Sequence, residues 1–219
     1  LSPTATEMLY AIGAGAQVRA VDKDSDYPRT APRTAINSLN LNVEAIAPYH
    51  PDLVVVSDMT AAQSAQFHEL GITVLKEPAA ANLAQVYQQL VQLGTVTGHQ
   101  GAATRKVAGM RARIARIVKA TPISHATYYY ELDQTYYSET SSTFIGQVLR
   151  LLGLHSIADS ASGAASSGGY PQLSAEFIFK ANPDYVLLAD TICCKQSAAT
   201  VAARPGWSAL SAVRHGRVV

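Results

Sequence analysis

Few residues of this chain are charged, and neither sign dominates. Of its 219 residues, 15% are Asp, Glu, Lys or Arg, and the formal net charge at pH 7 is +1. Nucleic-acid-binding domains usually carry a strong basic excess, which this composition lacks. Because 48% of the residues are hydrophobic, the chain can form one large or two small buried cores. We expect a globular protein with no nucleic-acid partner.

Cysteine is almost absent. Cys193 and Cys194 are consecutive, so they cannot crosslink distant segments. They form either a strained vicinal disulfide in an oxidising compartment or two thiols, and the sequence leaves their redox state open. Zinc ligands are usually two to four residues apart, so this pair is a poor metal motif.

Motifs of catalysis and phosphate binding are also missing. The sequence has no GxxxxGK[ST] loop, no GxGxxG after an apolar run, no GxSxG elbow and no HExxH pair. Its six histidines are scattered, which does not indicate a metal site. We therefore expect a non-enzymatic protein without catalytic residues, protein-held metal or resident cofactor.

No apolar run approaches the ~18 residues of a membrane span, and no signal peptide is recognisable. The chain opens at "LSPTATEM" and stops at "GRVV", so we expect it to be truncated at both ends. What the missing termini add, including a lipid anchor, is left open.

The longest regular feature is an amphipathic segment at 95–120. Five apolar residues recur there at helical spacing: Val107, Met110, Ile114, Ile117 and Val118. About 25 residues at ~1.5 Å each form a rod of roughly 37 Å, the width of a small domain. We predict a linking helix at 95–120 between an N-terminal lobe at 1–94 and a C-terminal lobe at 121–219.

Basic residues cluster on this predicted helix, with no acidic residue among them: Arg105, Lys106, Arg111, Arg113, Arg116 and Lys119. The simplest interpretation is a solvated helix face. A face directed at an anionic membrane surface is the alternative.

The segments on either side of the helix resemble each other. Six residue types recur at the same offsets from a glutamate: Glu44, Ile46, Pro51, Asp52, Val54 and Asp58, then Glu176, Ile178, Pro183, Asp184, Val186 and Asp190. Each copy predicts a short helix, a Pro-Asp turn and a buried strand ("LVVVSD", "YVLLAD") of the parallel type. Asn42 and Ser174 are candidate N-caps. We interpret the two copies as duplicated lobes.

Further short strands are expected at 18–21, 72–75, 124–130, 157–158 and the C-terminal end, alternating with helices. This predicts an α/β fold: two Rossmann-like lobes with parallel sheets, joined by one long α-helix, with a ligand cleft between the lobes. Ligands of such sheets bind beyond the carboxyl ends of the strands. The loops expected there are 22–40, 57–62, 131–140, 160–172 (Ser/Ala/Gly-rich at 160–169 and expected to be flexible) and 190–197.

Glu44 and Glu176 are unsuited to an acid/base dyad, because they occupy equivalent places in separate lobes. They stand at helix starts, which we expect to lie away from the strands' carboxyl ends. Symmetric placement instead suggests two equivalent contacts with a partner. Stabilisation by the helix dipole, about 0.3–1 kcal/mol each, is the alternative.

Tyrosine is the over-used aromatic residue, at 11 of 16. Tyr27, Tyr136, Tyr137 and Tyr170 fall in the expected ligand loops. A tyrosine offers an apolar face with a polar tip, which suits a bulky, partly polar ligand. Ordinary loop packing is the alternative for each one.

Several segments in their order resemble the periplasmic cobalamin and iron-siderophore binding proteins of ABC importers: "LSPTATEMLYAIGAG", "SDYP", "NVEAIAPYHPDLVVV", "FIGQVLRLLG", "YPQLSAEFIFKANPDYVLLAD" and "RPGWSALSAVRHGRVV". The resemblance covers nearly the whole chain. It implies two lobes joined by one helix, and one glutamate per lobe, Glu44 and Glu176, docking on arginines of the permease dimer.

The resemblance also implies a bound metal chelate, either a cobalamin-type corrinoid or a ferric siderophore or heme. The candidate ligand-binding residues are Asp24, Tyr27, Ser57, Tyr130, Tyr137 and Tyr170. Ser38 and Ser57 stand where cobalamin binders can have Trp, and Asn40 replaces the family's usual Gly, so the identity of the chelate is left open. We expect a monomeric extracytoplasmic carrier, periplasmic or lipid-anchored. A ligand sensor on the same fold and, less favoured, a cleft enzyme are the alternatives.

Overall fold

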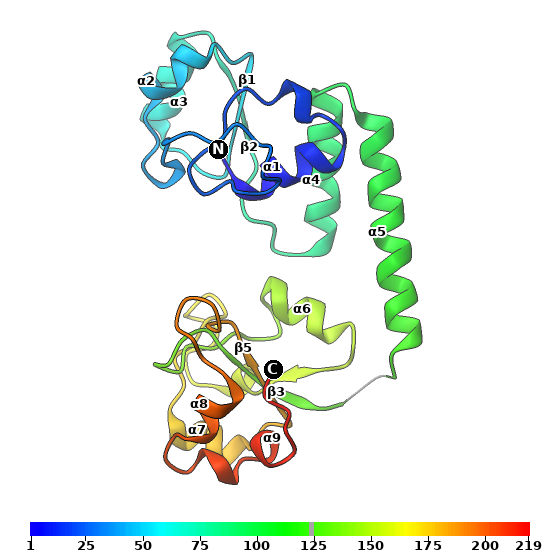
Figure 1. Cartoon of the computed structure of the whole chain (residues 1–219), viewed down its shortest axis with the longest axis vertical. Helices are drawn as coiled ribbons and strands as arrows, with labels where there is room; N and C mark the ends of the chain where they lie inside the picture. The colour runs from blue at the N-terminus through cyan, green and yellow to red at the C-terminus, as the bar shows by residue number, and fades with distance from the viewer. Residues whose placement is uncertain (123–124) are drawn as a thin grey trace. The chain divides into compact units, whose positions relative to one another are not determined.

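Two units divide the chain: Leu1–Ile114 (unit 1) and Ala115–Val219 (unit 2). The structure is a computed structural model that describes residues 1–122 and 125–219 (Figure 1). The α-helices are α1 (Pro3–Ala11), α2 (Val43–Ile46), α3 (Ala61–Glu69), α4 (Leu83–Val96), α5 (Gln100–Ala120), α6 (Phe144–Arg150), α7 (Ala175–Ala181), α8 (Ala198–Ala202) and α9 (Ser211–Arg214). The strands are β1 (Leu53–Val56), β2 (Thr73–Lys76), β3 (Thr127–Glu131), β4 (His155–Ser156) and β5 (Tyr185–Leu188). Short 3-10 helices are η1 (Gly15–Gln17), η2 (Ser38–Asn40), η3 (Ala47–Tyr49), η4 (Ile157–Ser160) and η5 (Trp207–Ala209).

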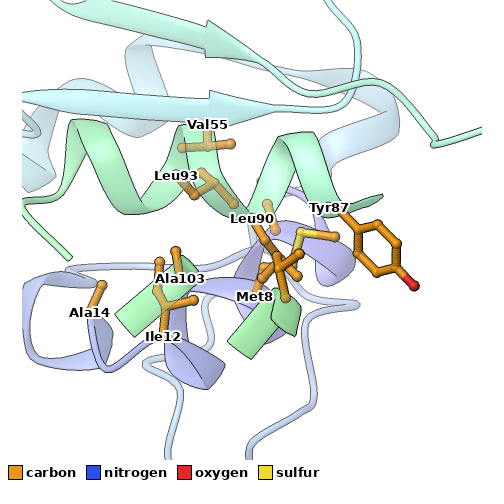
Figure 2. Close-up of a cluster of buried hydrophobic side chains, with 10 residues drawn as sticks. Met8, Ile12, Ala14, Val55, Tyr87, Leu90, Leu93 and Ala103 are labelled. Carbon is orange, nitrogen blue, oxygen red and sulfur yellow. The ribbon is translucent and has the colours of Figure 1, made fainter. Parts of the chain in front are cut away.

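Unit 1 is built around β1, which pairs in parallel with β2 from Leu53↔Thr73 to Val56↔Lys76. Side chains alternate across a strand, so the valines of β1 point to opposite faces. Val55 packs in a cluster with residues of α1, α4 and α5 (Figure 2). Val54 and Val56 pack in a second cluster, with α2 and α3. Helices therefore cover both faces of β1, as expected of a parallel sheet.

Unit 2 contains a parallel sheet in the order β4-β3-β5. Tyr129, Val186 and Trp207 belong to the apolar core on one face of β3. Tyr128, buried on the opposite face, donates a hydrogen bond to the Glu139 carboxylate. The prediction of an α/β protein with parallel sheets is thus confirmed.

The expected strand at 18–21 was wrong. Only Val21 forms a β-bridge, to Arg33, by donating to the Pro32 carbonyl and accepting from Thr34. The next ladder bond towards the N-terminus would need an N–H from Pro32, which proline lacks. The expected C-terminal strand is likewise a single bridge, Val186↔Val218.

Three other strands are shifted in sequence, and the one expected at 72–75 lies at Thr73–Lys76. The strand expected at 157–158 lies at His155–Ser156, because Ile157 begins a 3-10 helix capped by the Ser156 hydroxyl. The strand expected at 124–130 is observed as Thr127–Glu131, and its predicted start, Ser124, lies outside the described residues.

The helix expected at 95–120 is observed as Gln100–Ala120. It begins five residues late because α4 continues to Val96 and a turn follows, in which Gly98 has a φ of 75°. The boundary between the two units falls within this helix. Its linking role and the lobe limits 1–94, 95–120 and 121–219 stay predictions.

In the described ranges, 1–122 and 125–219, none of the helices combines the length and the apolar character needed to cross a bilayer.

Candidate ligand-binding and docking surfaces

Asp24 and Tyr27 lie in a loop of unit 1 that is held by hydrogen bonds of two buried residues, Asp22 and Ser25. Buried Asp22 accepts a hydrogen bond from the Asp24 N–H (2.9 Å), and buried Ser25 accepts one from the Thr6 hydroxyl on α1 (3.1 Å). The side chain of Tyr27 is 65% exposed, and Asp24 is also exposed. This loop therefore presents both predicted residues to solvent on an anchored backbone.

Ser57 follows β1 directly and is half-buried. It lines a cavity of about 210 Å³ together with Glu77, Gln89 and the first residues of α1. Burial raises the pKa of the Glu77 carboxyl, against a lowering by its hydrogen bond with Gln89. Glu77 was not predicted as a site residue, although a carboxylate directly after an apolar strand ("TVLKE") was a usable signal.

A larger cavity of about 420 Å³ lies at the other end of β1, beside Pro51, Asp52 and Leu53. None of the predicted ligand residues lines it. Because ligands of parallel sheets bind at the carboxyl ends of the strands, the smaller cavity is the better candidate in unit 1.

In unit 2, the segments 136–140 and 169–173 are paired along their length. Ser138 N–H donates to the Pro171 carbonyl (3.0 Å), Thr140 N–H to Gly169 (2.8 Å) and Leu173 N–H to Tyr136 (3.0 Å). Tyr137 and Gln172 form an antiparallel bridge. The segment 160–169, expected to be flexible, is a series of hydrogen-bonded turns that leads into this pairing.

The pairing places Tyr137 and Tyr170 on adjoining segments, and the bond from the Leu132 N–H to the Tyr137 carbonyl (2.9 Å) ties them to the end of β3, which carries Tyr130. Tyr137 and Tyr170 are 41% and 43% exposed, and Tyr130 is half-buried. The pKa of the Tyr130 hydroxyl is raised, first by burial and then by the charges of Glu139 and Tyr170. Tyr136 instead turns inward and stacks on Trp207, with ring centroids 5.9 Å apart.

A buried carboxylate, Glu139, organises the base of this surface. It accepts hydrogen bonds from the hydroxyls of Tyr128 (2.7 Å) and Thr143, and its own carbonyl accepts one from Ser156 (2.5 Å). Burial raises the pKa of the Glu139 carboxyl, while the hydrogen bonds from Thr143, Tyr128 and the Gly146 N–H oppose the shift. Sequence reasoning missed Glu139, although a lone acid in the polar run "SETSST" was a signal.

Glu44 and Glu176 are exposed and occupy the first turns of α2 and α7, with Asn42 and Ser174 as the predicted N-caps. Their predicted distance from the strands' carboxyl ends was wrong. The Gln63 side chain donates to the Leu41 carbonyl (2.8 Å), which ties the start of α2 to the start of α3, just past β1. In unit 2, the Leu173–Tyr136 bond ties the start of α7 to the segment that follows β3. A helix that precedes a parallel strand runs back along it, which the sequence interpretation overlooked.

The loop after β5 holds Cys193 and Cys194 as exposed free thiols. Asp190, near the start of this loop, is buried, and its carbonyl accepts hydrogen bonds from the N–H groups of Cys194 and Gln196. Among the described residues, no cluster of His, Cys, Asp and Glu forms a group of three suited to a metal ion. The ligand-binding roles predicted for six residues stay predictions: Asp24, Tyr27, Ser57, Tyr130, Tyr137 and Tyr170.

Comparison with protein families identifies the chain. A model of the periplasmic binding protein family matches residues 1–219. The chain belongs to this family. It is therefore a binding protein and not an enzyme, and the resemblance noted in its sequence is confirmed.

Two curated relatives are informative. The chain is 30% identical over its whole length to an uncharacterised ABC transporter substrate-binding lipoprotein, YvrC, of Bacillus subtilis, of which it covers 70%. Over 85% of its length it is 31% identical to a cobalamin-binding protein of Halobacterium salinarum, of which it covers 52%. The chain thus spans only about half of this second relative.

Solved structures share the fold. The periplasmic heme-binding protein HutB of Vibrio cholerae matches with a TM-score of 0.84 at 21% identity, covering 99% of this chain and 86% of HutB. The vitamin B12 binding protein BtuF of Vibrio cholerae matches with a TM-score of 0.72 at 23% identity, covering 100% of this chain and 84% of BtuF. At these identities the likeness establishes the periplasmic binding protein fold alone.

Proposed function

We propose that this chain is the extracytoplasmic substrate-binding protein of an ABC importer and captures a metal chelate, either a cobalamin-type corrinoid or a ferric siderophore or heme. The observation that carries the proposal is the surface of Tyr130, Tyr137 and Tyr170 at the carboxyl end of β3. The names of the relatives, which include ABC transporter, cobalamin-binding and heme-binding proteins, point to the same ligand class.

Tyr137 and Tyr170 suit the flat, partly polar periphery of such a chelate. Their exposed rings offer apolar faces, and their hydroxyls can bond to propionate, amide or catecholate groups. Asp24, Tyr27 and Ser57 are proposed as the contacts contributed by unit 1. Because burial disfavours the phenolate of Tyr130, this residue is better suited to donate a hydrogen bond than to bind iron.

A titration of intrinsic fluorescence tests the ligand. Trp207 is the one tryptophan, and it stacks on Tyr136, next to Tyr137. Cyanocobalamin, heme and a panel of ferric siderophores are added to the chain, with correction for their absorption. Saturable quenching by one class, weakened at least ~10-fold in Tyr137→Ala/Tyr170→Ala, supports the proposal, since each lost aromatic contact is worth about 1 kcal/mol or more.

Tyr49→Ala is the matched control. Tyr49 is similarly exposed, but it lies beside the 420 Å³ cavity, outside the proposed surface. Equal weakening by both variants, or no binding of any chelate by the folded chain, contradicts the proposed ligand surface.

Glu44 and Glu176 are proposed to dock on arginines of the permease. The support is their equivalent, exposed position at the first turn of a capped helix in each unit. A Glu44→Arg/Glu176→Arg variant should lose uptake in cells while it keeps its affinity for the chelate. Glu69→Arg is the control, because Glu69 is an exposed glutamate at the end of a different helix, α3.

The same experiment separates the carrier from a ligand sensor on this fold. A sensor that needs no permease would keep its cellular response in Glu44→Arg/Glu176→Arg. If this variant loses uptake but keeps its affinity for the chelate, the result supports a transport carrier over a sensor.

A further inference from the structure

We propose that one face of α5 binds the anionic headgroup surface of a lipid bilayer. Five cations form this face: Arg105, Lys106, Arg113, Arg116 and Lys119, hereafter the basic face. All five are exposed. The proposal goes beyond chelate capture, and its test needs no chelate.

The basic face is set by helical geometry. At 3.6 residues per turn, the five cations fall within an arc of about 140° around the helix axis. The residues on the other side, Ala103 and Val107, are buried in the core of unit 1, with Met110 packed against them. Figure 2 shows Ala103 within this core. The core therefore fixes which side of α5 faces away from unit 1.

The sixth cation of the helix, Arg111, has a different role. Its guanidinium lies over the ring of Tyr87, 4.7 Å from the centroid, at the border of the packed side. Elsewhere, Lys76 pairs with Asp58 and Arg204 with Glu131. Within residues 1–122 and 125–219, none of the five cations of the basic face forms such an ion pair. Their charge is thus available to an external anion.

The residues between these cations are small. Ala102, Gly109 and Ala112 lie within the same arc, and α5 contains no acidic residue. A helix of 21 residues is about 31 Å long, so the face is a long row of cations without bulky side chains. Such a row suits a broad, flat layer of phosphates, and without large apolar residues it would bind by charge and not by insertion.

Among anionic surfaces, a bilayer fits better than a nucleic acid. One relative is named a lipoprotein and another a periplasmic protein, and both names favour a membrane as the anionic surface. The net charge of +1 also means that any attraction must come from a local cluster and not from the whole chain.

The test is co-sedimentation of the full chain with vesicles of phosphatidylcholine, alone or mixed with phosphatidylglycerol. Binding is expected only to the mixed vesicles. It should weaken sharply between ionic strengths of about 0.01 M and about 0.15 M, where the screening length falls from about 30 Å to about 8 Å. Changing all five cations to Gln should reduce binding by more than ~100-fold, since each basic residue near such a surface is worth about a factor of five. Gln keeps a helix propensity similar to that of Arg and Lys.

A matched control separates the basic face from net charge. Arg19, Arg29, Arg33, Arg150 and Arg214 are exposed and scattered over other elements, and changing them to Gln alters the net charge by the same amount. This control should bind within about threefold of the unchanged chain, because its cations lie outside the row. Arg105→Lys/Arg113→Lys/Arg116→Lys should also bind normally.

Three results would overturn the proposal. They are equal losses in the two five-residue variants, no binding of the unchanged chain to mixed vesicles at low salt, and equal or tighter binding to a single-stranded oligonucleotide. If the chain binds no chelate, that result contradicts the proposed function but does not bear on vesicle binding by the basic face.

Discussion

Arg204 and Glu131, 73 residues apart, form a two-pronged ion pair at the end of β3. The guanidinium donates to both carboxylate oxygens at 2.6 Å, and the Glu131 side chain is fully buried. Arg204 also donates to the Gln196 side chain (2.7 Å) and lies over the Trp207 ring, 4.7 Å from its centroid. One side chain therefore joins the central strand, the cysteine-containing loop and the aromatic core of unit 2.

Arg204→Ala should destabilise unit 2 by about 3–5 kcal/mol, because it leaves a buried carboxylate without its partner. Urea unfolding followed by Trp207 fluorescence measures this, since the only tryptophan lies in unit 2. Arg150→Ala, at an exposed arginine of α6, should stay within about 0.5 kcal/mol. Replacing both partners with apolar residues (Arg204→Met/Glu131→Leu) should recover much of the loss. A loss below about 1 kcal/mol in Arg204→Ala would contradict the inferred importance of the pair.

The buried carboxyl of Glu139 should make the stability of unit 2 depend on pH. Its pKa is raised in the folded state, so the folded chain holds this proton more tightly than the unfolded chain. The resulting stabilisation is present below the ordinary Glu pKa of about 4.3 and is lost as the pH rises through the raised value. Glu139→Gln, which cannot titrate, should therefore gain stability relative to the unchanged chain as the pH rises above the ordinary Glu pKa of about 4.3.

Unfolding of both proteins at several pH values, followed by Trp207 fluorescence, measures this difference. Glu176→Gln is the control, because Glu176 is exposed and should leave the pH profile unchanged. A constant difference between Glu139→Gln and the unchanged chain at every pH would show that Glu139 has an ordinary pKa.

Gly146 is required at its position by close packing. A Cβ at this residue would overlap the Thr140 carbonyl oxygen and crowd the Glu139 carboxylate. Gly146→Ala should cost about 1–3 kcal/mol, although Ala is the better helix former, because the overpacked backbone must shift. The shift should also weaken chelate binding, since Thr140 pairs with Gly169 beside Tyr170. Gly109→Ala, on the open side of α5, should instead be neutral or stabilising, and thermal unfolding of both variants compares them.

The sequence was informative wherever a structure is set by neighbours along the chain. The N-caps Asn42 and Ser174, the two Pro-Asp turns and strands β1 and β5 all follow from residues within a few positions of each other. The same local patterns carried the resemblance to the family.

Contacts between distant residues were not predictable in this way. The Arg204–Glu131 pair and the pairing of segments 136–140 and 169–173 join positions about 30 to 73 residues apart. The periodicity of a sequence does not predict which two polar residues of distant segments will form a hydrogen bond or an ion pair. The wrong strand at 18–21 has the same cause, since the obstacle to its ladder is Pro32, on the partner segment.

The duplicated Pro-Asp turns should respond unequally to the same substitution. His50 and Asn182 each precede the proline and adopt left-handed backbone, with φ of 47° and 44°. Asn182 has a second role, because its side-chain oxygen accepts from the Ser211 N–H (2.8 Å) at the start of α9, whose own N-cap residue, Leu210, makes no side-chain hydrogen bond. Asn182→Ala should therefore cost about 1–2 kcal/mol, since it removes both a tolerated left-handed residue and a helix cap.

His50→Ala should cost less, about 0.5 kcal/mol, because only the backbone preference changes. Glycine separates the two contributions: His50→Gly should restore or exceed the original stability, whereas Asn182→Gly should recover the backbone part and still lack the cap. Trp207 fluorescence follows the Asn182 variants in unit 2, and far-UV circular dichroism follows the His50 variants in unit 1. If Asn182→Gly were as stable as the unchanged chain, the hydrogen bond to Ser211 would contribute no stability. Substitutions at His50 and Asn182 would then have similar effects on the free energy of unfolding.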